Sequence, residues 1–203
     1  MDSLNAPVPA AVQRLAAALR DDLGGFRSVR DRHTLVVKRL GDAAATDRGP
    51  EPRDDTAAAA ALRETLRPVL RDTDPFPARV DGLDVLAAPS GDAVVSLSVD
   101  SPGLVRLHRR LAAEFGAVDR VEGDAYLPHV TLARGWSGPG NENGDGSRNG
   151  DGSENGSADA SLRAVTARLR GRIESAVPVE WTVDELGLWS REYREFVWRE
   201  PLG

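Results

Sequence analysis

Two short stretches, "RHTLVVKRL" at residues 32–40 and "PHVTLARG" at residues 128–135, each bring a histidine and a threonine to the start of an apolar run. Apolar runs that are rich in β-branched residues predict β-strands. The chain contains three histidines in 203 residues, so two of the three fall at the starts of predicted strands. These two stretches therefore decide both the expected fold and the expected site.

The length and composition are those of one soluble domain. A chain of 203 residues can bury a core of its own, and 40% apolar with 29% charged residues is typical of globular proteins. No apolar run has the length needed to cross a membrane, and the N-terminal residues do not have the pattern of a signal peptide. We expect a single domain over residues 1–203, monomeric and cytoplasmic.

The residue counts exclude several kinds of chemistry. The absence of cysteine excludes disulfides, a thiol nucleophile and thiolate zinc sites. The formal net charge of −6 argues against a long basic face for duplex nucleic acid, but leaves a short or small phosphate ligand open. Lys38 is the only lysine. The preference for arginine, with abundant Ala, Asp and Gly, favours a GC-rich genome and a salt-loving host.

The pattern of apolar residues predicts alternating strands and helices. Residues 137–159, built mainly from Gly, Asn, Ser, Asp and Glu, predict a disordered surface insertion. The remaining parts predict an α+β fold with two similar halves, each carrying one histidine stretch. We expect strands at 2–8, from 33 onward, at 78–89, 92–100 and 125–136 and two within 179–202, with helices at 10–23, 56–72, 101–116 and 160–176.

The second stretch places an imidazole and a hydroxyl on one face. Strict alternation along the strand puts His129 and Thr131 together and Arg134 on the opposite face. Histidine exchanges protons near neutral pH, and a hydroxyl can donate to a phosphate oxygen, so the pair suits phosphoryl chemistry. A lone histidine on a half-buried strand is more often structural. His108, on the apolar stripe of a predicted helix, is interpreted in that structural way.

With a second histidine stretch, the chain resembles the two-histidine phosphoesterases, in the branch of RNA 2′,3′-cyclic phosphodiesterases also called 2′-5′ RNA ligases. Their signature is a His-x-Thr/Ser motif in each of two lobes. "HVTL" at 129–132 matches this signature fully and "HTLV" at 33–36 matches it in part. The order of other segments also fits, namely "KRLG", "FPARV", "LVRLHRRL" and the ending "LGLWSREYREFVWREPL".

The first stretch departs from the signature. Its hydroxyl, on Thr34, comes one position after His33 instead of two, and Leu35 stands where the family has Thr or Ser. A β-bulge could re-aim Thr34, another donor such as Arg39 could substitute, or the half-site could have lost a phosphate ligand. Counting back from "KRLG" even puts Thr34 at the histidine position. His33 is preferred because no other histidine is available there.

The resemblance implies a bilobal α+β fold, with two antiparallel sheets flanked by helices around a central cleft. It implies metal-independent hydrolysis of a 2′,3′-cyclic phosphate on RNA or nucleotide ends to a 2′-phosphate, with reverse 2′-5′ ligation as a side activity. It requires no cofactor and no metal site. The alternatives are a phosphoesterase acting on another small cyclic nucleotide, a non-catalytic module that binds phosphate or RNA ends, and a structural domain.

The resemblance also assigns roles to residues. His33 and His129 would be the catalytic acid and base, in an order that the sequence leaves open. The expected substrate-binding residues are Thr131, Thr34, Arg39, Arg134 and Tyr193. Alternation along the first strand puts Arg39 on the face of His33. For Arg134 a surface ion pair, and for Tyr193 core or hairpin packing, are the competing interpretations.

Overall fold

The computed structural model describes residues 2–40, 55–88, 92–138, 154–190 and 192–203. Its strands are β1 (Asp2–Pro7), β2 (Phe26–Val29), β3 (Thr34–Leu40), β4 (Phe76–Ala87), β5 (Ala93–Asp100), β6 (His129–Trp136), β7 (Val179–Val183), β8 (Glu185–Ser190) and β9 (Glu195–Pro201). Its helices are α1 (Ala10–Ala18), α2 (Asp55–Arg71), α3 (Pro102–Phe115) and α4 (Glu154–Ile173), with 3₁₀ turns at Arg20–Leu23 and Gly123–Ala125. Within the described residues, no helix has the length and apolar character needed to span a bilayer.

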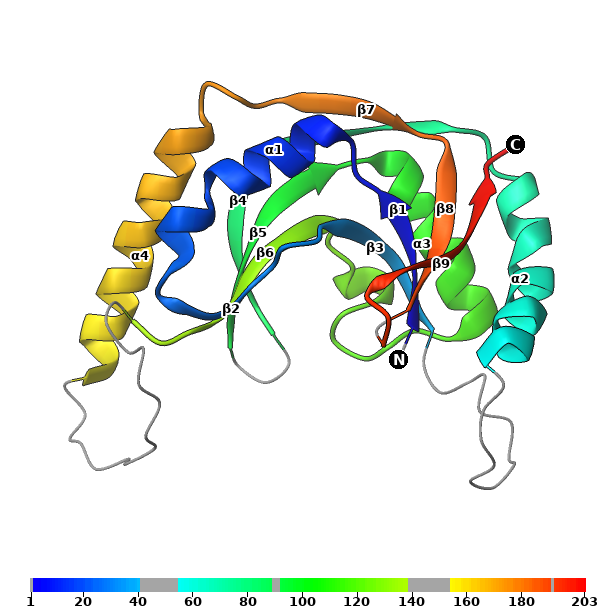
Figure 1. The fold of residues 1–203 in the computed structure, drawn as a ribbon, viewed down its shortest axis with the longest axis horizontal. Helices are drawn as coiled ribbons and strands as arrows, with labels where there is room; N and C mark the ends of the chain where they lie inside the picture. The colour runs from blue at the N-terminus through cyan, green and yellow to red at the C-terminus, as the bar shows by residue number, and fades with distance from the viewer. Residues whose placement is uncertain (1, 41–54, 89–91, 139–153, 191) are drawn as a thin grey trace.

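The strands form one curled antiparallel sheet in the order β7-β4-β5-β6-β3-β1-β8-β9, with β2 pairing to β6 off this path. The sheet consists of two halves that meet between β6 and β3, where the register contains a single pair, Leu35 opposite Val130. Figure 1 shows β3 and β6 side by side at the centre. The predicted antiparallel α+β architecture is confirmed, and the two predicted sheets are the two halves of one sheet, joined through this pair.

Helices cover each half of the sheet (Figure 1). In one half, α4 packs on β4, and its Arg170 donates a hydrogen bond to the Leu83 carbonyl oxygen. In the other half, α3 packs against β3, and α2 packs against β9. Arg63 and Arg67 of α2 form ion pairs with Glu200 of β9.

The local sequence of α3 shows why this helix forms. The Ser101 hydroxyl caps its start by accepting a hydrogen bond from the Leu104 N–H, and Pro102 follows at the first helical position. Leu104, Leu107 and Leu111 form a buried stripe. Gly116, with φ of 74°, follows the last residue of the helix in a conformation that glycine adopts readily.

Three elements differ from those expected from the sequence. Strand β2 was not predicted, because its four residues are too short to show a period. The C-terminal segment forms three strands instead of two, because the chain crosses at Asp184 from β7, which pairs with β4, to β8, which pairs with β1. Helix α4 begins at Glu154, inside the expected insertion at 137–159. Residues 139–153 of that insertion lie outside the described residues.

Two β-bulges interrupt the strict alternation of side chains in the central strands. In β3, Asn5 pairs with Val36 and Leu4 pairs with Lys38, so Val37 has no partner on β1. In β6, Ser96 pairs with Thr131 and Val95 pairs with Ala133, so Leu132 has no partner on β5. Because directly opposite residues share a face of a sheet, each bulge reverses the facing of the residues that follow it.

We predict that Leu35→Ala costs about 2–5 kcal/mol of unfolding free energy, the range for removing a buried leucine side chain. Leu35 is 0% exposed and forms the one registered pair between the halves. Denaturant unfolding would measure the loss. Val197→Ala is the matched control, because Val197 is 44% exposed in β9. Equal and small losses in both variants would contradict the central role of this pair.

Candidate functional site

Side chains of β3 and β6 line a cleft on the face of the sheet opposite the core. Leu35 and Val130 are fully buried in the core, so their neighbours along each strand point the other way. A cavity of about 490 Å³ includes Thr34, Val36 and Thr131 in its lining. A second cavity of about 170 Å³ includes His129. The two cavities share Val36, Arg39 and Arg134, and together they form the cleft.

The two bulges determine which arginines reach the cleft. Alternation predicted Arg134 on the face opposite His129, and this is wrong, because the bulge at Leu132 returns Arg134 to the cleft face. The bulge at Val37 likewise turns Arg39 into the cleft, on the face of Thr34 and not, as alternation predicted, on the face of His33. The Arg134 Nε has no hydrogen-bond partner among the described residues.

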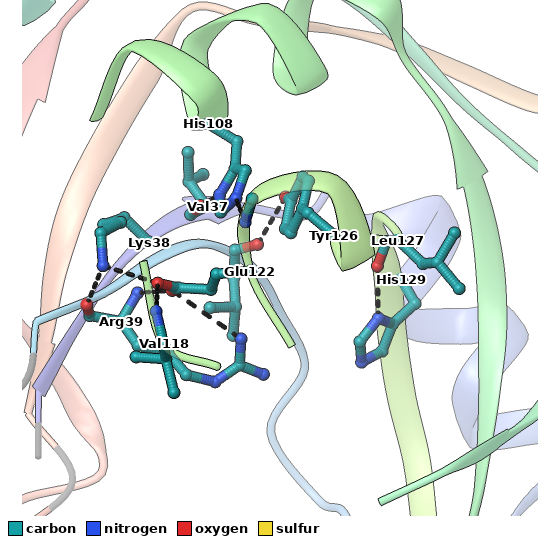
Figure 2. Close-up of polar contacts among 11 residues, drawn as sticks. Val37, Lys38, Arg39, His108, Val118, Glu122, Tyr126, Leu127 and His129 are labelled. Atoms are coloured by element: carbon teal, nitrogen blue, oxygen red, sulfur yellow. Dashed lines mark hydrogen bonds and ion pairs between the residues drawn. The ribbon is translucent and has the colours of Figure 1, made fainter. Parts of the chain in front are cut away.

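His129 has a defined tautomer. Its Nδ1 lies 2.7 Å from the Leu127 carbonyl oxygen, which can only accept, so Nδ1 carries the proton and Nε2 of the neutral ring is an acceptor (Figure 2). Burial lowers the pKa of His129, the hydrogen bond to Leu127 opposes this, and the charges of Arg39 and Arg134 lower the pKa further. The neutral imidazole is therefore favoured near pH 7.

The structure does not place His33 in the lining of the cleft, so His33 and His129, which the sequence pairs, do not face one cavity together. His33 precedes β3, is 8% exposed and is absent from the lining of both cavities. Its Nδ1 lies 3.2 Å from the Thr131 carbonyl oxygen, and Gln13 of α1 donates to the His33 carbonyl. Burial lowers the pKa of His33, against the effect of its hydrogen bond to Thr131. These contacts are those of a structural histidine.

Thr34 occupies the position that corresponds to His129. The two strands run antiparallel about the Leu35–Val130 pair, so an approximate two-fold axis there relates residues 95 apart (130 − 35). This axis relates Thr34 to His129 and Val36 to Thr131. It also relates the bulge of β3 to the bulge of β6. Arg39 likewise matches Arg134. Of the histidines, which all lie in the described residues, only His129 lines the cleft.

Of the remaining predicted site residues, two line the cleft and one does not. Thr34 and Thr131 line the larger cavity, and Asn5 donates a 2.8 Å hydrogen bond to the Thr34 hydroxyl. Tyr193 is 54% exposed in the β8–β9 turn and does not line either cavity of the cleft.

Sequence reasoning missed three arginines of the larger cavity, Arg30, Arg32 and Arg194. Loop arginines carry no periodic signal that would reveal them. A repeat signal did exist for the strands, because "TLVVKR" and "HVTLAR" align over six positions and end on a shared arginine.

A buried carboxylate behind the cleft holds β3 in place. Glu122 accepts hydrogen bonds from the Lys38 ammonium at 2.6 Å, the Arg39 N–H at 2.6 Å and the Val118 N–H at 2.9 Å (Figure 2). Burial alone would raise the Glu122 pKa, but these hydrogen bonds outweigh it and hold the pKa below its usual range. Glu122 also lies 3.9 Å from the Arg39 guanidinium. It therefore fixes the backbone from which Arg39 enters the cleft.

His108 and Tyr126 extend this network. The His108 Nδ1–H donates to the Val37 carbonyl at 2.7 Å, and its Nε2 accepts from the Gly123 N–H at 2.8 Å. The Tyr126 ring stacks on His108 with 3.7 Å between centroids, and its hydroxyl donates to the Val36 carbonyl. The structural interpretation of His108 agrees with these contacts. The network joins the β3 bulge to the segment that leads into His129.

Comparison with known proteins identifies the fold. The model of the 2′-5′ RNA ligase superfamily matches residues 45–138, which include the His129 stretch and exclude the His33 stretch. Similar solved structures include TT0787 of Thermus thermophilus (16% identity, 99% of this chain and 97% of that chain, TM-score 0.55) and E. coli LigT in apo form (17%, 99% and 96%, 0.51). Kluyveromyces marxianus Usb1 with uridine monophosphate is also similar (9%, 99% and 97%, 0.54). No curated protein sequence matches the chain.

We predict that Glu122→Ala lowers the unfolding free energy by about 3–5 kcal/mol, because it leaves the Lys38 ammonium buried without its counter-charge. The Lys38 and Glu122 side chains are 2% and 0% exposed. Adding Lys38→Met removes the unpaired charge, so the double variant should regain part of the loss in denaturant unfolding. A double variant as unstable as Glu122→Ala would contradict the assignment of the cost to the unpaired charge.

Proposed function

We propose that the chain is a two-histidine phosphoesterase, which binds the 2′,3′-cyclic phosphate end of RNA and opens it to a 2′-phosphate; the match of residues 45–138 to the 2′-5′ RNA ligase superfamily supports this. The proposal is carried by one observation, a neutral imidazole with a fixed tautomer beside Thr131 and two arginines in one cleft. The chemistry uses His129 as the single proton acceptor. The same site would join a 2′,3′-cyclic phosphate end to a 5′-hydroxyl end. The 5′-hydroxyl attacks phosphorus in place of water and gives its proton to His129, the P–O3′ bond breaks, and the product carries a 2′-5′ linkage and a protonated 3′-hydroxyl.

In the proposed reaction, a water molecule attacks phosphorus and passes a proton to the His129 Nε2. This atom is the acceptor of the neutral ring, since Nδ1–H is bound to Leu127. A lowered pKa keeps the ring unprotonated near neutral pH, which is the state a general base requires. Leu127, through its carbonyl, acts as the positioning partner that orients the ring.

The cations and hydroxyls around His129 bind the phosphate. Arg39 and Arg134 present guanidinium groups, which suit phosphate oxygens because their N–H donors form a planar fork. The Thr131 hydroxyl and the Thr34 hydroxyl add uncharged donors. These groups face negative charge that grows on the non-bridging oxygens in the transition state, and they stabilise it.

The departing 3′ oxygen has no imidazole to protonate it. Thr34 stands at the position related to His129, and a threonine hydroxyl is too weak an acid to give up its proton at neutral pH. The 3′ oxygen therefore takes its proton from solvent when the P–O3′ bond breaks. General acid–base catalysis contributes about 10²–10⁴-fold, so we expect turnover slower than that of a site with two imidazoles by a factor in this range.

A second candidate function is a non-catalytic module that recognises RNA ends carrying a cyclic phosphate. Thr34 and Val36, which replace a His-x-Thr pair at the related positions, favour it. Incubating the protein with an oligoribonucleotide ending in a 2′,3′-cyclic phosphate distinguishes the two functions. A 2′-phosphate product supports the enzyme. Binding without product supports the module, and the absence of both contradicts the two proposals together.

Exchange of each histidine for glutamine tests the single-imidazole site. We predict that His129→Gln removes turnover of the cyclic phosphate, whereas His33→Gln retains it and loses only stability. The His33 variant is the matched control because His33 contacts the backbone of β6 outside the cleft. Thermal unfolding of both variants would show that each is folded. Loss of turnover in folded His33→Gln would overturn the assignment.

Restoring the missing motif gives a test by gain of activity. We predict that Thr34→His with Val36→Thr raises kcat by about tenfold or more, as a new general acid regains part of the roughly 10²–10⁴-fold that acid–base catalysis contributes. Val36→Thr alone is the control, and its kcat should change little. An increase equal in both variants, or none in the double variant, would contradict the equivalence of Thr34 and His129.

The pH dependence of kcat/KM gives a further test. The wild type needs neutral His129, so its activity is lost as the pH falls through the His129 pKa, which lies below the ordinary value of about 6.5. Above that pKa the profile should be level. Thr34→His with Val36→Thr should add a second, descending limb at higher pH, where the new acid loses its proton. A wild-type midpoint above 7 would contradict the proposed base.

A further inference from the structure

The larger cavity of the cleft extends beyond the residues around Thr131. Its volume of about 490 Å³ lies within the range of small-molecule sites. Its lining contains strand residues, which include Thr34, Arg39, Arg134 and Trp189 and which we call the floor, and three arginines outside the strands, Arg30, Arg32 and Arg194, which we call the rim. The rim arginines come from the β2–β3 connection and from the β8–β9 turn.

The positive charge of this cavity is only partly compensated. Arg194 pairs with Asp31 at 2.5 Å, and Arg39 lies 3.9 Å from Glu122. Among the described residues, no carboxylate lies within ion-pair distance of Arg30, Arg32 or Arg134. Burial lowers the pKa of Arg134, and the charges of Arg30 and Arg39 lower it further, so these cations lie close enough to repel one another. The whole chain, by contrast, carries a formal net charge of −6.

Two hydrogen bonds within the protein hold the rim in place. The Arg32 guanidinium donates to the Arg194 carbonyl at 2.6 Å, and the Arg194 guanidinium donates to Asp31 at 2.5 Å. These two contacts join connections that lie about 160 residues apart in the chain (194 − 32 = 162). Trp189 stands in the same lining and packs edge-on to Phe196, with 5.2 Å between ring centroids.

One phosphate does not use this many cations. The floor provides Arg39, Arg134 and two hydroxyls for the cyclic phosphate of the proposed function, which leaves the rim arginines without a ligand. Three guanidinium groups next to an indole ring suit a nucleic acid strand, in which phosphates alternate with bases that stack on aromatic rings. Inorganic polyphosphate contains no base that could stack on the indole ring.

Resting on the proposed function, we propose that Arg30, Arg32 and Arg194 form a second phosphate subsite, which binds the phosphodiester preceding the cyclic end of an RNA strand. The substrate is then an oligonucleotide end and not a mononucleotide. Arg194 and Asp31 hold the rim in shape, while Arg30 and Arg32 carry the charge that no acidic side chain among the described residues balances.

The test compares the affinities of adenosine 2′-phosphate and of the dinucleotide ApA with a 2′-phosphate end, two products that the enzyme does not turn over. Titration calorimetry at low and high salt gives each Kd. We expect the wild type to bind the dinucleotide about tenfold or more tightly than the mononucleotide. The ratio of the two affinities should fall as the salt concentration rises. Each phosphate of a single strand that the protein neutralises adds about 0.7 to the steepness with which log K falls against log salt.

Arg30→Gln with Arg32→Gln should reduce the ratio of the two affinities to about one. Arg14→Gln with Arg106→Gln is the matched control, because both arginines are exposed on helices outside the cleft. An equal affinity of the wild type for both ligands, or a ratio that survives in Arg30→Gln with Arg32→Gln, would overturn the second subsite. Failure to bind either ligand would instead contradict the proposed function itself.

Discussion

The pairing of Leu35 with Val130 is the constraint on which the cleft depends. It is the single registered contact between β3 and β6, and it places both residues in the core. A slip of one residue would exchange the faces of every side chain in one half of the sheet. With the observed register, Thr34 and His129 stand at related positions above the junction. The identity of the cleft residues therefore follows from one buried pair.

The bulges and the buried carboxylate complete this arrangement. Each bulge turns one arginine towards the residues that the central pair has already placed, which gathers positive charge in a protein whose net charge is negative. Glu122 lies behind the cleft and accepts a hydrogen bond from the Arg39 N–H of the bulged strand, so the backbone that carries this arginine is fixed. The same cations favour the neutral form of His129 and would attract an anion. Anion binding and proton transfer are thus linked through charge.

Much of the fold could be predicted from the sequence, because long apolar patterns with helical or strand period define α3 and β4–β6. The site could be predicted only in part. His129 and Thr131 follow from alternation, since no bulge separates them. The facing of Arg134 does not, because a bulge is set by pairing with a neighbouring strand and leaves no mark in a single sequence. The sequence favours His33 over Thr34, but Thr34 is the one that lines the larger cavity, for a related reason: the face of a strand's first residue depends on its partner strand.

An NMR titration of the three histidine side chains with adenosine 2′-phosphate tests the single-imidazole cleft most directly. If His129 lies beside the bound phosphate, its ring signals shift on binding and its pKa rises, because a dianion beside the imidazole favours the charged form. The signals of His33 and His108 should keep their positions and pKa values. A shift and a pKa change of His33 comparable to those of His129 would contradict a cleft with a single imidazole, since His33 would then lie beside the phosphate.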